Sequence, residues 1–137
     1  MNVGQGTLQD EAVIRELIGQ WTTAVRRRDF AGILQDHSSD IIMFDVPPPF
    51  ESKGIEAYEQ TWNLFFSCSA DPIVFDIDSM AITAGTDVAF VAATMHCTQP
   101  GPDEARQELK FRLTMGLRKI CGRWTITHEH HSVPAGD

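Results

Sequence analysis

The chain has 137 residues, of which 42% are apolar and 22% are charged, and its formal net charge is −8. This apolar fraction is enough for one domain with a real core, here residues 1–137, and it excludes an intrinsically disordered chain. The acidic balance argues against nucleic acid and against anionic membrane surfaces, because both partners require a basic protein surface.

The cysteines and the N-terminus indicate the compartment. The three cysteines, Cys68, Cys97 and Cys121, are odd in number and widely spaced, unlike a disulfide framework or a cysteine zinc site. The first residues, "MNVGQGTLQDEA", lack the apolar run of a signal peptide, and no stretch approaches the roughly 18 apolar residues of a membrane span. We therefore expect a reduced, cytoplasmic protein.

Helical patterns dominate the first half of the chain. Thr7 and Asp10 resemble an N-cap with an acidic first turn, and Asp29 is placed to cap a second, short helix. Between these caps, apolar residues recur at helical spacing: Leu8, Ile14, Leu17, Ile18, Trp21 and Val25. A strand follows in "DIIMFDV" (40–46), the prolines 47–49 stop it, and "KGIEAYEQTWNLFF" (53–66) returns to helical spacing.

The second half reads as strands. Four strand-like runs at 73–83, 88–98, 107–119 and 123–133 are separated by turn-forming segments, which indicates successive antiparallel strands. The predicted order is helix, helix, strand, helix and then four strands, or ααβαββββ. This order predicts an α+β fold with three helices packed on one face of a curved sheet.

Two segments resemble a known family. The strand, proline loop, glycine and helix of "MFDVPPPFESKGIEAYEQTW" (43–62), together with "GRWTITHEHHSVP" (122–134), resemble the SnoaL-like, ketosteroid-isomerase-like branch of the NTF2-like superfamily. The resemblance covers nearly the whole chain. It implies a cone in which a bent, mostly antiparallel sheet wraps around the helices, with a pocket at the open end. It also implies a homodimer that pairs through the outer face of the sheet.

Asp45 is the most specific catalytic candidate. In ketosteroid isomerases a general-base aspartate ends this strand, and a glycine nine residues later opens the next helix, as Asp45 and Gly54 do here. The resemblance implies that Asp45 moves a proton next to a carbonyl group. The alternative is a structural carboxylate that caps the proline loop or pairs with Arg112.

The oxyanion partners of that family have no clear counterparts. The position that resembles the family's tyrosine is Trp21, and the second acid falls near Thr114 or Met115. Losing such a donor typically costs about 100- to 1,000-fold in rate. This difference argues against steroid isomerisation by the family's route.

The histidines of "WTITHEHHS" (124–132) divide by strand alternation. In a regular strand His128 and His130 share a face with Trp124 and Ile126, which predicts that they point inward. Glu129 and His131 are on the other face, which predicts that they point to solvent or a subunit contact. Three interpretations stay open for the inward pair: neutral histidines of the pocket wall, acid–base groups near Asp45, or ligands of a metal. A metal site needs a third ligand, for which His96 is the first choice and Asp45 the next.

Aromatic and basic residues complete the predicted site. Ligand-binding candidates are Trp21, Tyr58, Trp62, Arg112 and Trp124. The aromatic members have an alternative role in core packing, and Arg112 has one in a salt bridge. Along 109–117, the residues Leu109, Phe111, Leu113, Met115 and Leu117 form one apolar side opposite Arg112, but which face lines the pocket is open.

Three functions are compatible with these patterns. The leading hypothesis is a small enzyme without a cofactor or metal, in which Asp45, helped by His128 or His130, moves a proton on an apolar, carbonyl-bearing small molecule. Isomerisation, cyclisation and dehydration belong to this class. The second hypothesis is a non-catalytic ligand-binding or dimerisation module of the same fold. The third is a metal-dependent hydrolase built on the His-x-His pair.

Overall fold

The computed structural model describes residues 3–69, 71–100 and 106–136, which form three helices and one six-stranded sheet. The elements in chain order are α1 (Val3–Arg26), α2 (Phe30–Leu34), β1 (His37–Phe44), β2 (Ser52–Lys53), α3 (Ile55–Ser67), β3 (Phe75–Ala84), β4 (Val88–Pro100), β5 (Arg106–Ile120) and β6 (Arg123–Ser132). The predicted α+β class and element order are confirmed, with the two-residue β2 as an addition. The helix α1 begins at Val3, four residues before the predicted cap at Thr7.

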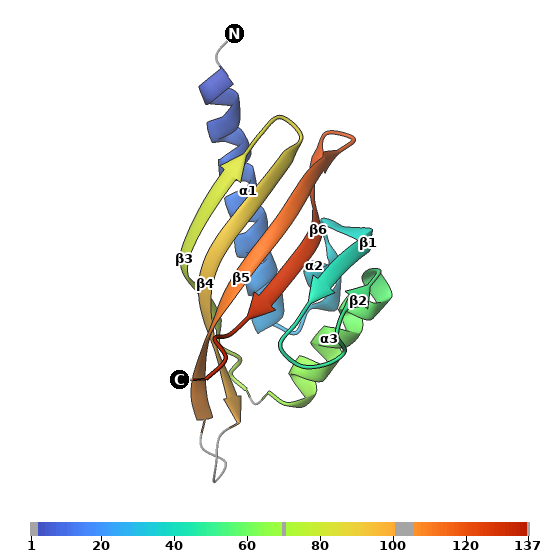
Figure 1. The fold of residues 1–137 in the computed structure, drawn as a ribbon, viewed down its shortest axis with the longest axis vertical. Helices are drawn as coiled ribbons and strands as arrows, with labels where there is room; N and C mark the ends of the chain where they lie inside the picture. The colour runs from blue at the N-terminus through green and yellow to red at the C-terminus, as the bar shows by residue number, and fades with distance from the viewer. Residues whose placement is uncertain (1–2, 70, 101–105, 137) are drawn as a thin grey trace.

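The sheet has the order β2-β1-β6-β5-β4-β3 and is strongly curved (Figure 1). Strands β3 to β6 pair antiparallel as a meander, whereas β1 pairs with β6 in parallel. This parallel pairing aligns Phe44 with His130. As a result, the residues that follow each of these two positions lie next to each other at one end of the sheet.

The helices cover one face of the sheet, with α1 running across it and α3 beside β1 and β2 (Figure 1). The apolar stripe of α1 is buried there, with Ile14, Ile18 and Val25 all fully covered. The predicted apolar side of β5 belongs to the same buried core, since Leu113, Met115 and Leu117 are at most 1% exposed. We call this helix-covered side the inner face of the sheet.

A β-bulge in β6 reverses the expected alternation. Along β5, Gly116 pairs with His128 and the next residue, Leu117, pairs with Ile126, so Thr127 is an extra residue in β6. A bulge of this kind shifts the alternation of side chains by one position. Trp124 and Ile126 are buried on the inner face as predicted.

Beyond the bulge the predicted orientations are wrong. Glu129 and His131 point inward and are buried, whereas His130 is exposed and His128 is only partly covered. The physical reason is the extra residue at Thr127, which a regular period-two strand does not contain.

Asp10 fixes α1 to the β5–β6 hairpin. Its carboxylate accepts hydrogen bonds from Trp124 Nε1 at 3.0 Å and from Lys119 Nζ at 3.1 Å. The hydrogen bond from Trp124 lowers the pKa of Asp10, and Lys119 adds to this effect against partial burial. At α2 the predicted cap is confirmed, because Asp29 Oδ1 accepts from the Gly32 amide. None of the described helices is long and apolar enough to cross a membrane.

Candidate functional site

A cavity of about 440 Å³ lies between the second half of α3, the segment after β1 and the inner face of the sheet. Its walls are mostly apolar and aromatic. The lining residues are Met43, Asp45, Val46, Pro47, Thr61, Trp62, Leu64, Phe65, Cys68, Ser69, Phe75, Cys97, Thr98, Leu109, Phe111 and His131. This volume and chemistry are typical of pockets for small apolar molecules.

Asp45 and His131 bring ionisable groups to this apolar wall. They are brought together because Phe44 aligns with His130 in the parallel pair, so the next residue of each chain segment is adjacent. Asp45 Oδ1 lies 3.8 Å from His131 Nδ1 and also accepts a hydrogen bond from the Val46 amide at 2.8 Å. The Asp45 side chain is 21% exposed, so solvent and a ligand can both reach it.

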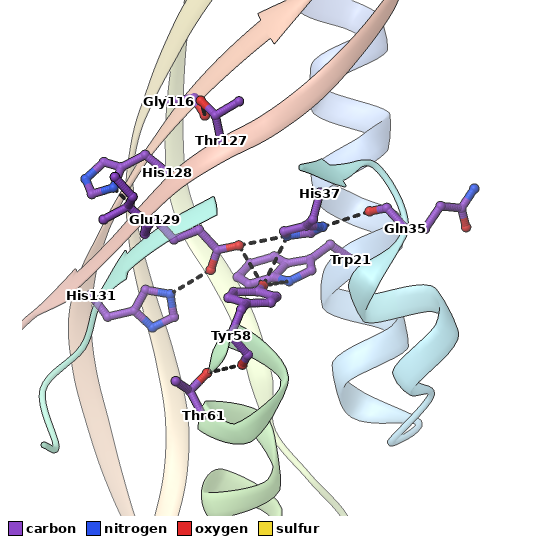
Figure 2. A network of polar contacts seen from close by, with 11 residues as sticks. Trp21, Gln35, His37, Tyr58, Thr61, Gly116, Thr127, His128, Glu129 and His131 are labelled. Carbon is purple, nitrogen blue, oxygen red and sulfur yellow. Dashed lines mark hydrogen bonds and ion pairs between the residues drawn. The ribbon is translucent and has the colours of Figure 1, made fainter. Parts of the chain in front are cut away.

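Glu129 holds the other side of the His131 ring. Its carboxylate is fully buried and accepts from His131 Nε2 at 3.2 Å, from His37 Nε2 at 2.8 Å and from the Tyr58 hydroxyl at 2.6 Å (Figure 2). Burial alone raises the pKa of Glu129, but the hydrogen bonds and positive charges of His131 and His37 outweigh burial and lower it to about 2. Glu129 is therefore a carboxylate anion at neutral pH.

His37 is the second histidine partner of Glu129. Its Nδ1 lies 2.8 Å from the backbone carbonyl of Gln35, and its Nε2 lies 2.8 Å from the Glu129 carboxylate. The Tyr58 hydroxyl lies 3.1 Å from the same Nε2. His37 and Glu129 thus form a buried pair whose polar atoms are hydrogen-bonded, the condition under which a buried carboxylate is tolerated.

Tyr58 and Trp21 complete this network behind the pocket wall. Trp21 Nε1 donates to the Tyr58 oxygen at 3.1 Å, and the Tyr58 hydroxyl donates to Glu129 (Figure 2). Burial, and then the charge of Glu129, raise the pKa of Tyr58 well above its usual value. Neither residue lines the cavity, so both predicted ligand contacts are directed to Glu129 instead.

Of the other predicted ligand-binding residues, only Trp62 lines the cavity. Trp124 lies at the opposite end of the inner face, where its indole donates to Asp10. Arg112 is on the exposed side of β5 and donates to Ser132 Oγ at 3.1 Å, not to Asp45 or Glu129. Its predicted pairing fails because Arg112 has the opposite alternation to the inward Phe111 and Leu113.

The outward histidines are away from the cavity. Figure 2 shows His128 on the opposite side of β6 from Glu129, and its Nδ1 donates to the Ile42 carbonyl at 2.7 Å. The Phe44 ring lies against His128 and His130 at centroid distances of 5.0 and 5.5 Å. Neither of these histidines lines the cavity, although His130 lines a separate hollow with Asp45 on the other side of the proline segment.

The predicted metal cluster does not assemble. His96 pairs with Asp78 at 2.8 Å and Asp76 at 3.5 Å, both on β3. The strand β5 separates β4 from β6, so His96 cannot join the His128 and His130 pair. Within residues 3–69, 71–100 and 106–136, no group of three or more His, Cys, Asp or Glu side chains is arranged to hold a metal ion.

The period-two pattern gave no signal for the inward pair of Glu129 and His131, because the extra residue at Thr127 is not marked by its residue type. His37 had no signal either, because it reaches Glu129 through the parallel pairing of β1 with β6.

The pKa of the Cys97 thiol depends on burial and charge in the cavity wall. Its thiol is buried, and burial, followed by the nearby charge of Asp45, raises the pKa of Cys97 to about 11. This thiol is therefore protonated at neutral pH and is a poor nucleophile. The effect of Asp45 on Cys97 also agrees with a carboxylate that faces the cavity.

The fold and this pocket define an NTF2-like protein. Residues 14–136 match the model of the SnoaL-like domain, and the chain belongs to that family. The predicted resemblance is thus confirmed at the level of the superfamily and of its SnoaL-like branch. No curated protein matches the chain.

Solved structures agree with this assignment. An NTF2-like protein of unknown function from Pseudomonas putida KT2440 is 35% identical over 93% of this chain and 89% of its own, with a TM-score of 0.84. A ketosteroid isomerase-like protein from Erwinia carotovora atroseptica is 19% identical over 88% of this chain and 93% of its own, with a TM-score of 0.73. An NTF2-like protein with a cystatin-like fold from Novosphingobium aromaticivorans is 16% identical over 95% and 85%, with a TM-score of 0.80. The last two likenesses show the fold alone.

Proposed function

We propose that this protein is a small pocket enzyme that transfers a proton on an apolar, carbonyl-bearing small molecule, with Asp45 as the base. The observation that supports this function best is the position of Asp45. Its carboxylate lines an otherwise apolar cavity, 3.8 Å from an imidazole nitrogen that another carboxylate holds in place. A base removes a proton next to a carbonyl most effectively where water is largely excluded.

The cavity walls favour a flat, apolar substrate. Trp62, Phe65, Phe75 and Phe111 present aromatic surfaces, while Asp45 and His131 are the carboxylate and the imidazole among the described lining positions. Such walls bind ring systems by apolar contact and orient them through one or two polar groups. Isomerisation, cyclisation and dehydration all begin with the proton transfer proposed for Asp45.

The test is hydrogen exchange at carbon, because it detects proton abstraction without knowledge of the product. A panel of small ketones and enones is incubated with the protein in D2O, and loss of the α-hydrogen signals is followed by NMR. We expect Asp45→Asn to slow the exchange about 100- to 10,000-fold. Asp40→Asn, which changes an exposed carboxylate on β1, is the matched control and keeps the wild-type rate. Equal exchange in both variants, or no exchange with any compound, contradicts the proposal.

A non-catalytic binding module is the second candidate, and one observation favours it. Trp21, at the position that resembles the family's oxyanion tyrosine, and the predicted ligand-binding residue Tyr58 both donate within the Glu129 network. Under this alternative, apolar compounds quench the fluorescence of Trp62 on binding, but their α-hydrogens do not exchange. Binding together with exchange excludes it.

We also propose that the chain forms a homodimer through the outer face of its sheet. The outward side chains of Ile42, Val88 and Phe90 are 38%, 58% and 54% exposed, which is unusual for apolar residues on one face of a sheet. Light scattering should give the mass of a dimer, and Phe90→Asp should reduce it to that of a monomer. A monomeric wild-type protein contradicts this part of the proposal.

A further inference from the structure

Proton abstraction by Asp45 creates a negative charge that the site must hold. The C–H bond next to the carbonyl breaks, its proton moves to Asp45, and its electron pair forms an enolate whose charge resides on oxygen. The enzyme gains rate only if a group in the cavity stabilises that oxygen. Tyr58 and Trp21 cannot do so while they donate within the Glu129 network.

His131 is the candidate that the negative charge of an enolate favours. No lysine or arginine is found among the described residues that line the cavity, so His131 is the one lining side chain there that can carry a positive charge. Its ring lies between two carboxylates, with Nε2 3.2 Å from Glu129 and Nδ1 3.8 Å from Asp45. Nε2 donates to Glu129, while Nδ1 faces Asp45 across a distance too long for a hydrogen bond, which leaves its hydrogen available to a ligand oxygen.

Aromatic rings from three elements pack against His131. Phe111 of β5 stacks on the ring at 5.6 Å and 30°. Trp62 of α3 and Trp21 of α1 contact it edge-on at 6.3 and 6.4 Å. These three packed side chains are uncharged, and the charged groups that face the ring are Glu129 on its own strand and Asp45 after β1.

We propose that His131 is the oxyanion-binding residue of this site and that Glu129 is its positioning residue. The proposal rests on the proposed function and deepens it. The imidazolium Nδ1–H donates to the carbonyl oxygen of the substrate and then to the enolate oxygen. Glu129, itself fixed by His37 and Tyr58, fixes the ring so that Nδ1 is the nitrogen on the cavity side.

The charges balance at each step. Before the transfer, the imidazolium of His131 faces the carboxylate of Asp45, and His37 is paired with Glu129. After the transfer, Asp45 is neutral, and the charge of His131 is balanced by the enolate. His131 keeps both of its protons, and Asp45 returns its proton to carbon to complete the reaction. The net charge of the site is unchanged throughout, so no buried charge is left without a partner.

The experiment uses a stable mimic of the intermediate. Asp45→Asn imitates the neutral, protonated base, and 4-nitrophenol provides an oxyanion whose phenolate and phenol forms absorb at different wavelengths. We expect the Asp45→Asn protein to bind 4-nitrophenol as the phenolate, at a pH at which the free compound is mostly phenol. A further His131→Asn change should weaken phenolate binding at least about tenfold, the loss expected for one charged hydrogen bond. His130→Asn in the same background is the matched control, because His130 is adjacent but exposed, and it should leave binding unchanged.

Three results overturn the inference: binding of the neutral phenol, phenolate binding that does not depend on His131, and no binding at all. If the His131→Asn protein does not fold, nitrogen-15 NMR of the phenolate complex of Asp45→Asn decides instead. Two protonated ring nitrogens on His131 support the inference, and one protonated nitrogen overturns it. The proposed function is judged separately by α-hydrogen exchange in the wild type. Exchange without phenolate binding keeps Asp45 as the base but removes His131 from its role.

Discussion

The two faces of β6 beyond its bulge give the same residue types opposite surroundings. On the inner face, His131 is 7% exposed and has carboxylates on both sides of its ring. On the outer face, His128 and His130 contact the Phe44 ring, and the hydrogen-bond partner of His128 is a backbone carbonyl. The inner face therefore holds the histidine that lines the cavity and has charged partners, which is the residue proposed to bind the oxyanion. A single extra residue, Thr127, decides which histidine that is.

The inner face carries a cost that the outer face does not. A buried carboxylate is tolerated only when its oxygens are fully hydrogen-bonded and its charge is balanced. Glu129 meets this condition through three donors from β6, α3 and the start of β1. The network therefore links the elements that surround the cavity, and its loss should affect stability as well as chemistry.

Removing the charge of Glu129 on the inner face should lower the free energy of unfolding far more than a change on the outer face. Glu129→Gln removes the buried carboxylate that accepts from His131, His37 and Tyr58, and breaking a buried pair in this way typically costs about 3–5 kcal/mol. Urea unfolding should show this loss in the free energy of unfolding. His130→Gln on the outer face is the control and should stay within about 0.5 kcal/mol of the wild type. Similar losses in both variants would mean that the network does not stabilise the fold.

The Glu129 carboxylate should also make the free energy of unfolding depend on pH in the acid range. The folded pKa of Glu129 is lowered to about 2 from a usual 4.5, so its stabilising effect is complete above pH 4.5 and is lost as the pH falls toward 2. We expect the difference in free energy of unfolding between the wild type and Glu129→Gln to shrink across this interval. Urea titrations at several pH values between neutral and 2 measure it. A difference that is constant with pH contradicts a charged Glu129.

The fold followed from local patterns, whereas the site depended on a departure from them. The helical stripe of α1, the prolines after β1 and the four strands after Pro72 each express a regular period or a known turn residue, so the class and order were predictable. Asp45 was singled out because its spacing to Gly54 matches the resembled family, and the structure places it in the cavity wall. Glu129 and His131 were assigned to the wrong face because a bulge adds one residue to one strand without a composition of its own.

His37 shows a second limit on prediction. Its role depends on contact with Glu129, which is far away in sequence and becomes its neighbour only through the parallel pairing of β1 with β6. No periodicity relates such residues. For Arg112 the alternation along β5 was predicted correctly, but the cavity lies on the opposite face of the sheet.

Chemical labelling of the histidines should reproduce the two faces directly. Diethyl pyrocarbonate modifies exposed imidazoles, so His130 should react first, and His131 and His37 should react only as the protein unfolds. Mass spectrometry of peptides taken at increasing times measures the order. A regular strand without the bulge would expose His131 and protect His130. Labelling of His131 before His130 therefore contradicts the orientation of β6.

The smallest expected effect is on the reactivity of the Cys97 thiol, which can be compared with that of the two exposed cysteines. A pKa of about 11, caused first by burial and second by the charge of Asp45, leaves about one thiol in a thousand ionised at pH 8. Cys68 and Cys121 are exposed and should react rapidly with a thiol reagent such as DTNB, while Cys97 should react slowly and speed up about tenfold per pH unit. Asp45→Asn removes the smaller cause, so Cys97 should become slightly more reactive, with Asp40→Asn as the unchanged control. If both variants leave the rate of Cys97 the same, the Asp45 charge does not reach the cavity, and the base proposed for this pocket lacks the orientation that its chemistry requires.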